Sequence, residues 1–400
     1  MDGIAPFGVG RLPRITFGPG RVAEVPETVA RYGGRALVIT GAASFRRSPH
    51  WKALLDGLAH DGVEHSEASV SGEPEALFVD ELLARYREQP IDVVLGIGGG
   101  SVLDTAKALA GLLRTTTSLV DHLEGMPTQV RYPGPALPWI AVPTTAGTGS
   151  EATRNGTFIV RGEHAAKRSF RDERLVAAEA IVDPDLLVGQ SAEGLAANGA
   201  DALTQLIESH LSVRANRFTD ALAIDALPDV GVALPRWHAA VVAGGDDAAA
   251  RSAMSYGALA GGISLAHAGL GVVHGLVAPL SAVIEVPHGA GCGAMLTAGI
   301  EANVQALESR APDSPALAKL SRLGRLLAGS TGDDAAARRA LVDWLRALVE
   351  RLQLRGLAAY GVTDELIGQV AATARMSSSM RSNPVELTEE ELANILLASL

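Results

Sequence analysis

Two histidines and an aspartate in the second half of the chain are the residues best suited to bind a metal ion. His274 and His288 lie in the largely apolar stretch Gly269–Gly291, and each is followed by a glycine that lets the backbone pack closely against a bound group. Imidazole is the commonest metal ligand in proteins, and a carboxylate from elsewhere could complete the site. A single histidine in such surroundings is more often a core residue, but two on separate segments favour a shared ligand.

Asp201 and Gln205 belong to the segment Asp201–His210, which reads DALTQLIESH. On a helix, residues four apart lie on the same face, one turn above the other. Aspartate with histidine at these two places would predict a metal site directly, but the second residue here is glutamine. Three interpretations are open: a metal site with three strong ligands, a site that has lost its metal, or an ordinary helix start. The third would leave the two histidines unexplained.

A glycine-rich turn in the first half could bind a phosphate group. In Leu95–Ala108 (LGIGGGSVLDTAKA), three successive glycines follow an aliphatic strand, and Ser101 adds a hydroxyl where a helix should begin. Free N–H groups and the helix dipole at such a place favour a pyrophosphate. The spacing is neither GxGxxG nor GxxxxGKS/T, so it indicates neither an ordinary Rossmann enzyme nor a P-loop NTPase. A tight strand-to-helix turn without a ligand is the alternative.

A second loop of the first half is rich in hydroxyl groups. The segment Ala141–Thr153 reads AVPTTAGTGSEAT and follows a strand. A glycine-containing loop of this kind can line a nucleotide or a carboxamide group, although one or two hydroxyls alone would suggest only a hydrophilic turn. The hydroxyl-bearing residues concerned are Thr144, Thr145, Thr148 and Ser150.

The first half of the chain alternates between strand-like and helical segments. This alternation predicts a doubly wound α/β domain with ligands at the carboxyl ends of its strands. We expect strands in Arg35–Gly41, Gly62–Val70, Ile91–Gly100 and at the start of Leu137–Glu151. Helices are expected in His50–Gly62, Glu75–Pro90 and Ser101–Arg114.

From about Ser191 onward, apolar residues recur at helical spacing, which predicts an all-helical domain. Several of the expected helices begin at Asp, Ser or Thr in the N-cap position. They span residues 191–212, 217–234, 246–268, 314–329, 333–354, 363–379 and 388–400. We therefore predict an α/β plus all-α protein, with a dinucleotide-binding domain in residues 1–190 and a helical metal- and substrate-binding domain in residues 191–400.

The composition is that of a soluble globular enzyme. Hydrophobic residues make up 47% of the 400 residues, and the net charge of −11 argues against nucleic-acid binding. The N-terminus lacks a secretory signal and no apolar run reaches the roughly 20 residues of a membrane span, so we expect a cytoplasmic protein. Cys292 is the only cysteine, so neither an intrachain disulfide nor a Cys-based zinc site is expected. We interpret Cys292 as a buried, inert thiol.

Five segments together resemble the iron-containing (group III) alcohol dehydrogenases, in the order in which that superfamily has them. They are Gly98–Ala108, Pro143–Thr153, Ala180–Pro184, Gly199–Ser209 and Ala268–Gly289. The resemblance implies a dehydroquinate synthase-like fold, with an N-terminal Rossmann-like dinucleotide-binding domain and a C-terminal helical metal-binding domain. It also implies NAD(P)-dependent interconversion of alcohols and carbonyl compounds, and a homodimer or larger homo-oligomer.

The resemblance further implies roles for individual residues. Lys167 would contact the ribose of the nucleotide, and the hydroxyl-rich loop would line the cofactor. Asp201, His274 and His288 match three of the family's four metal ligands. The pyrophosphate loop and its continuation into the helix would comprise Gly98, Gly99, Gly100, Ser101, Asp104 and Lys107.

Two positions depart from the family pattern. Gln205 occupies the place of the fourth ligand, usually histidine, and Ala278 stands where a histidine with a proton-relay role is common. Three protein ligands and an open position suffice for a catalytic zinc ion, and Gln205 could add its amide oxygen as a weaker ligand. Loss of one imidazole should shift the preference from Fe²⁺ toward Zn²⁺. With alanine at position 278, we expect the proton to travel through water, the ribose hydroxyl or His267.

The choice of nicotinamide cofactor depends on the end of the strand Arg35–Gly41. An acidic residue there would accept a hydrogen bond from the 2′-hydroxyl of the adenosine ribose. No carboxylate follows Gly41, whereas Ser44, Arg46 and Arg47 could bind a 2′-phosphate. We therefore favour NADPH or dual use, with arginines that only face solvent as the alternative.

These features together predict a metal-assisted, NAD(P)-dependent alcohol dehydrogenase or aldehyde reductase with a small alcohol or carbonyl substrate. Asp201, His274 and His267 are the residues expected at the reaction centre, with Fe²⁺ or Zn²⁺ polarising the substrate oxygen. One alternative is a metal-free reductase of the maleylacetate type. Another is a synthase or lyase similar to dehydroquinate synthase, which uses bound NAD transiently. A binding module without enzymatic activity would leave the sites without purpose.

Overall fold

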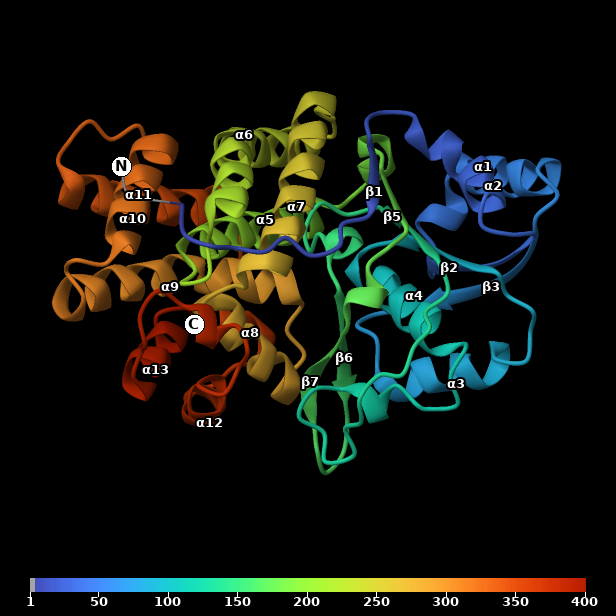
Figure 1. Cartoon of the computed structure of the whole chain (residues 1–400). Helices are drawn as coiled ribbons and strands as arrows, with labels where there is room; N and C mark the ends of the chain where they lie inside the picture. The colour runs from blue at the N-terminus through green and yellow to red at the C-terminus, as the bar shows by residue number, and fades with distance from the viewer. Residues whose placement is uncertain (1–3) are drawn as a thin grey trace. The chain divides into compact units, whose positions relative to one another are not determined.

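The computed structural model describes residues 4–400, and the chain divides into two compact units (Figure 1). One unit is Gly10–Val188, and the other is Gly189–Leu400 together with the N-terminal stretch up to Val9. The first contains a parallel sheet with helices and the second is helical, which confirms the predicted fold class.

The first unit is built on a six-stranded sheet in which every neighbouring pair of strands is parallel. The strand order is β1-β8-β5-β4-β2-β3. The bounds are β1 (Arg14–Phe17), β2 (Arg35–Gly41), β3 (Glu64–Val70), β4 (Val93–Gly98), β5 (Trp139–Pro143) and β8 (Glu179–Val182). β2 has the bounds that the aliphatic run predicts, and β3, β4 and β5 lie within their predicted segments.

Side chains of alternate residues in β2 enter two different cores, as the pleat of a strand requires. Leu37 and Ile39 pack with residues of α3 (Ala76–Tyr86) and α4 (Gly100–Leu112). Ala36 and Val38 pack with residues of α1 (Val25–Ala30) and α2 (Pro49–His60). The sheet is therefore covered by helices on both faces, which is why its central strands are apolar throughout.

The strand order reverses between β2 and β4. From β2 the chain passes outward to β3 and then returns to β4, on the other side of β2. In open α/β sheets, ligands bind outside the carboxyl ends of the strands at such a reversal. The residues after β2 and the glycine-rich turn after β4 both lie at this edge.

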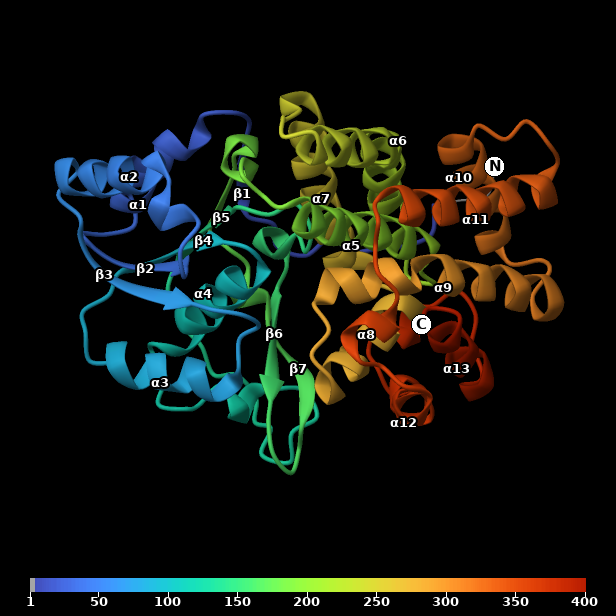
Figure 2. The same ribbon diagram turned by 180° about the vertical axis from the view of Figure 1, so that it is seen from behind.

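An antiparallel hairpin that the sequence analysis did not predict follows β5. It consists of β6 (Asn155–Val160) and β7 (Ala166–Arg171), which form a separate two-stranded sheet (Figure 2). The residues of β7 read AKRSFR, and only Phe170 among them is buried. The strand therefore lacks the alternating apolar pattern from which a strand is recognised.

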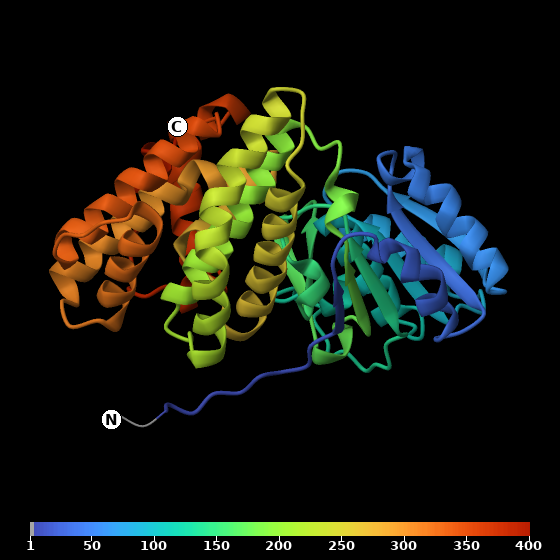
Figure 3. The same cartoon turned by 90° about the horizontal axis from the view of Figure 1, so that it is seen from above.

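The second unit contains nine α-helices within the described residues. They are α5 (Ala192–Leu211), α6 (Arg217–Val242), α7 (Ala248–Ala268), α8 (Val272–Val283), α9 (His288–Arg310), α10 (Pro315–Ala328), α11 (Asp334–Arg351), α12 (Asp364–Ala374) and α13 (Glu389–Leu397). Helices α5, α6 and α7, drawn in green to yellow, lie side by side (Figures 1 and 3). Every segment of residues 191–400 that was predicted to be helical coincides with one of these helices, although α6 runs on beyond residue 234 to Val242, and α8 and α9 were not predicted.

None of the helices within residues 4–400 is by itself long and apolar enough to cross a membrane. Only α7 and α8 taken together meet the length and composition required, and the two are bent by 93° at the break between them.

Lys107 on α4 fastens the loop that follows β5. Its side chain is fully buried, and its ammonium group donates to Ser150 O and Ser150 Oγ at 3.0 Å each, to Thr153 Oγ1 at 2.7 Å and to Asn155 O at 2.6 Å. Burial lowers the pKa of Lys107 to about 8, against the opposing charges of Asp104 and Glu151. These bonds satisfy a buried cation and tie α4 to the start of β6.

Substitution Lys107→Met should destabilise the first unit by about 3–5 kcal/mol, because it leaves several buried oxygens without their donor. Urea-induced unfolding followed by circular dichroism would measure this as a lower midpoint. The matched control is Lys52→Met, since Lys52 is 82% exposed and pairs only with Asp56 on the surface; its loss should be below about 1 kcal/mol. Similar midpoints for the two variants would contradict the anchoring role.

Candidate metal centre and cofactor loops

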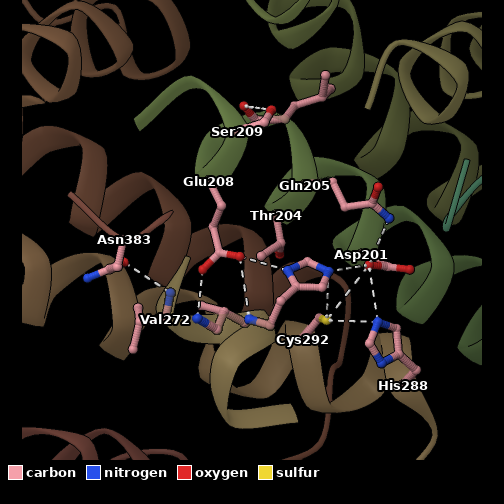
Figure 4. A network of polar contacts seen from close by, with 12 residues as sticks. Asp201, Thr204, Gln205, Glu208, Ser209, Val272, His288, Cys292 and Asn383 are labelled. Carbon is pink, nitrogen blue, oxygen red and sulfur yellow. Dashed lines mark hydrogen bonds and ion pairs between the residues drawn. The ribbon is translucent and has the colours of Figure 1, made fainter. Parts of the chain in front are cut away.

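Four side chains with metal-binding groups converge within the helical unit. They are Asp201 on α5, His274 on α8, and His288 and Cys292 on α9. One ligand atom from each lies within 4.8 Å of all the others. Figure 4 shows Asp201, His288 and Cys292 pointing toward one another. The structure thus brings together three residues predicted from the sequence and adds Cys292, which had been interpreted as an inert core thiol.

The distances between these atoms suit a divalent ion. Asp201 Oδ1 lies 3.1 Å from His274 Nε2 and 3.9 Å from His288 Nε2. Cys292 Sγ lies 3.7 Å from Asp201 Oδ1, 3.7 Å from His274 Nε2 and 3.9 Å from His288 Nε2. Around a tetrahedral zinc ion, bonds of about 2.0–2.2 Å to nitrogen or oxygen and about 2.3 Å to sulfur place the ligand atoms about 3.3–3.7 Å apart. Small movements of these side chains would therefore bring the four atoms to the distances that a tetrahedral zinc ion requires.

Charges within the cluster shift the pKa values of its members. Burial opposes the charge on Asp201, but the hydrogen bond from His274 and the charges of His288 and His274 outweigh it and lower the pKa of Asp201 to about 2. Burial also opposes the charge on His274, yet Cys292, Asp201 and Glu208 raise its pKa well above the ordinary value. Burial raises the pKa of the Cys292 thiol to about 11. A coordinating thiol, by contrast, is deprotonated outright.

Glu208, one of the residues that the sequence analysis missed, orients His274. Its Oε2 lies 2.7 Å from His274 Nδ1, and both side chains are buried. Because a carboxylate accepts, Nδ1 carries a proton toward Glu208, and Nε2, which faces Asp201, is the nitrogen that would bind a metal ion. The only sequence signal for this role is the position of Glu208 on the helix of Asp201, two turns further along.

Glu208 also caps the helix that carries His274. Its carboxylate accepts from Val273 N at 2.6 Å and from His274 N at 3.4 Å, and Asn383 Oδ1 accepts from Val272 N at 3.0 Å. A Cβ atom on Gly271 would lie 2.8 Å from Asn383 Oδ1 and 3.0 Å from Glu208 Oε1. Glycine is therefore required where α8 begins, because the two capping groups approach the backbone so closely.

The hydrogen bonds of Gln205 and His267 differ from those expected of a metal ligand and of a proton relay. Gln205 Nε2 donates to Asp201 Oδ1 at 3.2 Å, so its amide nitrogen faces the carboxylate (Figure 4). His267 Nδ1 donates to Ile263 O at 2.7 Å, and its ring packs edge-on against Phe218. A ligand role for Gln205 and a relay role for His267 both stay predictions.

The two loops expected to bind the cofactor pack against each other in the first unit. Thr144 N donates to Gly98 O at 3.0 Å. A Cβ atom on Gly99 would lie 3.2 Å from Thr145 Oγ1, and one on Gly100 would lie 2.8 Å from Thr148 Cγ2. The glycines thus allow the two loops to approach at the N-terminus of α4, and Ser101 occupies its first turn.

Hydrogen bonds of Asp104 and Ser150 stabilise the contact between these two loops. Ser150 Oγ donates to Asp104 Oδ1 at 2.5 Å, and Thr157 N donates to Asp104 Oδ2 at 2.8 Å. Both residues therefore hold the hydroxyl-rich loop and β6 in place, and direct contact of either with a nucleotide stays a prediction.

Two of the three cations expected to meet the nucleotide, Lys167 and Arg46, are paired with carboxylates. Lys167 Nζ lies 2.9 Å from Glu73 Oε2. Arg46 Nη1 lies 2.5 Å from Glu67 Oε2, its Nε donates to Thr40 Oγ1 at 2.7 Å, and its guanidinium group stacks on Trp51. Ser44 and Arg47 are exposed beside it, and Gly41 ends β2.

Two family models together match almost the whole chain. The model of the iron-containing alcohol dehydrogenases matches residues 13–184, and that of the C-terminal part of the Fe-containing alcohol dehydrogenase family matches residues 195–400. The chain belongs to the iron-containing alcohol dehydrogenase family. It is an oxidoreductase, and its family binds NAD(H) and a divalent metal ion.

Relatives within the iron-containing alcohol dehydrogenase family extend over the full length of the chain. A probable alcohol dehydrogenase, EutG, of Escherichia coli (strain K12) is 30% identical over 391 residues, which cover 97% of this chain and 93% of the relative. The NAD-dependent methanol dehydrogenase of Bacillus methanolicus is 30% identical over 387 residues, or 96% and 97% of the two chains. The crystal structure of a 1,3-propanediol oxidoreductase has a TM-score of 0.89 at 27% identity and covers 99% of this chain and 100% of its own.

Substitution Glu208→Gln should weaken metal binding about 10–100-fold, because an amide orients His274 less strongly than a carboxylate. Competition with a chromophoric chelator would measure this. The matched control is Asn383→Ala, which removes a cap of α8 without touching His274; it should lower stability by about 0.5–2 kcal/mol and leave the metal affinity nearly unchanged. If both variants lose affinity equally, Glu208 acts only as a helix cap.

Proposed function

We propose that the chain is a metal-assisted, NAD(P)-dependent alcohol dehydrogenase or aldehyde reductase for a small substrate. The observation that carries this proposal is the convergence of the buried Asp201 and His274 with the half-buried His288 in one cluster of the helical unit. A divalent ion bound there would supply a Lewis acid that polarises the substrate oxygen.

The residues of the chain divide the remaining tasks. Free N–H groups at the start of α4 would bind the pyrophosphate, and the loop from Thr144 to Ser150 would line the nicotinamide part of the cofactor. With a metal ion on Nε2, the hydrogen bond to Glu208 would keep the proton of His274 on Nδ1. His288 is 28% exposed, against 2% for Asp201 and 6% for His274, so a small substrate would approach the cluster past His288.

The names of the relatives support a small alcohol or carbonyl substrate. They include a methanol dehydrogenase and a 1,3-propanediol oxidoreductase, whose similarity covers nearly the whole of this chain. With alanine at position 278, we propose that the proton leaves through water, the ribose hydroxyl or His267. A homodimer or larger homo-oligomer in the cytoplasm is proposed on the same family resemblance.

Removal of the metal ion tests the function. Dialysis against a chelator should lower turnover of a small aldehyde with NADH or NADPH by at least about 10²-fold, since a Lewis acid contributes several kcal/mol to such a reaction. Addition of Zn²⁺ or Fe²⁺ should restore turnover. Full activity without stoichiometric metal would instead favour a metal-free reductase of the maleylacetate type, and bound cofactor without net redox change would favour a synthase.

The proposed preference for NADPH rests on Arg46 and the absence of a carboxylate after Gly41. Substitution Arg46→Ala should raise KM for NADPH about tenfold or more, because a hydrogen bond to a charged group contributes about 1.5–3 kcal/mol, while KM for NADH should change little. The partner variant Glu67→Gln frees the guanidinium group from its ion pair and should lower KM for NADPH. Equal changes for both cofactors would remove the argument for a 2′-phosphate site.

A further inference from the structure

We propose that Cys292 is the fourth protein ligand of the metal ion, in place of the imidazole that position 205 lacks. The thiolate would make the site selective for Zn²⁺ over Fe²⁺. The proposal presupposes the metal-assisted function proposed above, and it assigns a ligand that the family resemblance does not indicate.

The position of the sulfur atom carries the proposal. Cys292 Sγ lies at 3.7, 3.7 and 3.9 Å from the ligand atoms of Asp201, His274 and His288, so it stands almost equally far from all three. It therefore forms the apex of a pyramid over the other three ligand atoms, and the three edges that meet at the sulfur are close to those of a tetrahedral zinc site. A cysteine that served only to fill the core would have no reason to face one carboxylate and two imidazoles.

The helix that carries Cys292 holds the sulfur at this place. His288 is the first residue of α9, and Cys292 follows one turn later on the same face, the spacing with which one helix supplies two metal ligands. A Cβ atom on Gly289 would lie 2.4 Å from Ala197 O, and one on Gly293 would lie 3.2 Å from Ala200 Cβ. These close approaches fix α9 against α5, the helix of Asp201.

Gln205 has a different task in this arrangement. Its amide nitrogen, and not the amide oxygen that could bind a metal ion, faces Asp201 and donates to Asp201 Oδ1. The hydrogen bond restrains the carboxylate, which makes Gln205 a positioning residue. The fourth ligand has thus moved from α5 to α9, while the other three positions of the site are kept.

Replacement of an imidazole by a thiolate changes the chemistry of the site in two ways. Asp201 and Cys292 together would bring two negative charges, which balance a divalent ion in buried surroundings. Thiolates also bind Zn²⁺ well, whereas a set of oxygen and imidazole ligands suits Fe²⁺ as well as Zn²⁺. Zinc can accept a fifth ligand, so four protein ligands leave room for the substrate oxygen.

Spectroscopy on the intact protein tests the assignment, since Cys292 is the only cysteine in the chain. X-ray absorption of the Zn²⁺-loaded protein should show one sulfur at about 2.3 Å beside nitrogen and oxygen at about 2.0–2.2 Å. The Co²⁺-loaded protein should show thiolate-to-cobalt charge-transfer absorption, and Cys292→Ser should abolish it. The same variant should weaken Zn²⁺ binding more than about 100-fold, whereas Gln205→Leu should keep the sulfur signal and weaken binding only about 10–100-fold.

A double variant tests metal selectivity. Gln205→His combined with Cys292→Ala restores an imidazole on α5 and removes the sulfur, so the ratio of Zn²⁺ to Fe²⁺ affinity should fall at least tenfold. Stoichiometric metal and full turnover without a sulfur signal would overturn the role of Cys292 and leave the proposed function intact. Turnover by a protein that binds neither Zn²⁺ nor Co²⁺ would overturn both.

Discussion

The metal centre depends on a single buried carboxylate, that of Glu208. Helix α8 begins with N–H groups that have no partner within the helix, and the positive end of its dipole favours an anion. The carboxylate of Glu208 accepts hydrogen bonds from two of these N–H groups and places a negative charge at the positive end of the dipole. It also accepts a hydrogen bond from Nδ1 of His274. Since Glu208 and Asp201 belong to α5, the helix that carries Asp201 also orients His274. Burial of a carboxylate is unfavourable unless its oxygens are satisfied, and here the start of α8 satisfies them, so the helix and the carboxylate stabilise each other.

The α/β unit is stabilised by the same principle. Lys107 and Asp104 project from α4 and bind the loop that follows β5, so that the two cofactor loops keep their mutual approach. Asp183, at the end of β8, is completely buried and accepts from Gly20 N at 3.2 Å, Val22 N at 2.8 Å and Asp185 N at 2.9 Å. Lys107, Asp104 and Asp183 thus belong to motifs that suggest a function, but the contacts observed for them stabilise the loops of the protein. Each of these buried charges is paired with backbone or hydroxyl groups, which explains why such polar residues occur in an otherwise aliphatic core.

Local patterns in the sequence predicted the elements whose apolar residues recur regularly, among them β2 (Arg35–Gly41) and the helices from α5 to α7. Helices α8 and α9 were missed because glycines interrupt both, and glycine disfavours a helix when only local preference is considered. The structure gives the reason for two of them: a Cβ atom on Gly275 would lie 2.7 Å from Met380 Cε, and Gly289 lies against the backbone of α5. Such contacts join residues far apart in the chain, so no local pattern reports them. Asp201, His274 and His288 were found because aspartate and histidine are suspected as ligands wherever they occur in apolar surroundings.

Cys292 was missed for a related reason. A lone cysteine among small residues is usually a core residue, and its single local signal is its place one helical turn after His288. Its setting becomes evident only when α5, α8 and α9 are packed together, because each contributes part of the cluster. The scaffold fixes the distances between the ligand positions, but the identity of the atoms at those positions decides which ion is preferred. Relatives about 30% identical share the scaffold with this chain. In our proposal the choice of metal depends on only two of its residues, Gln205 and Cys292, so that membership of an iron-containing family would not by itself determine the ion.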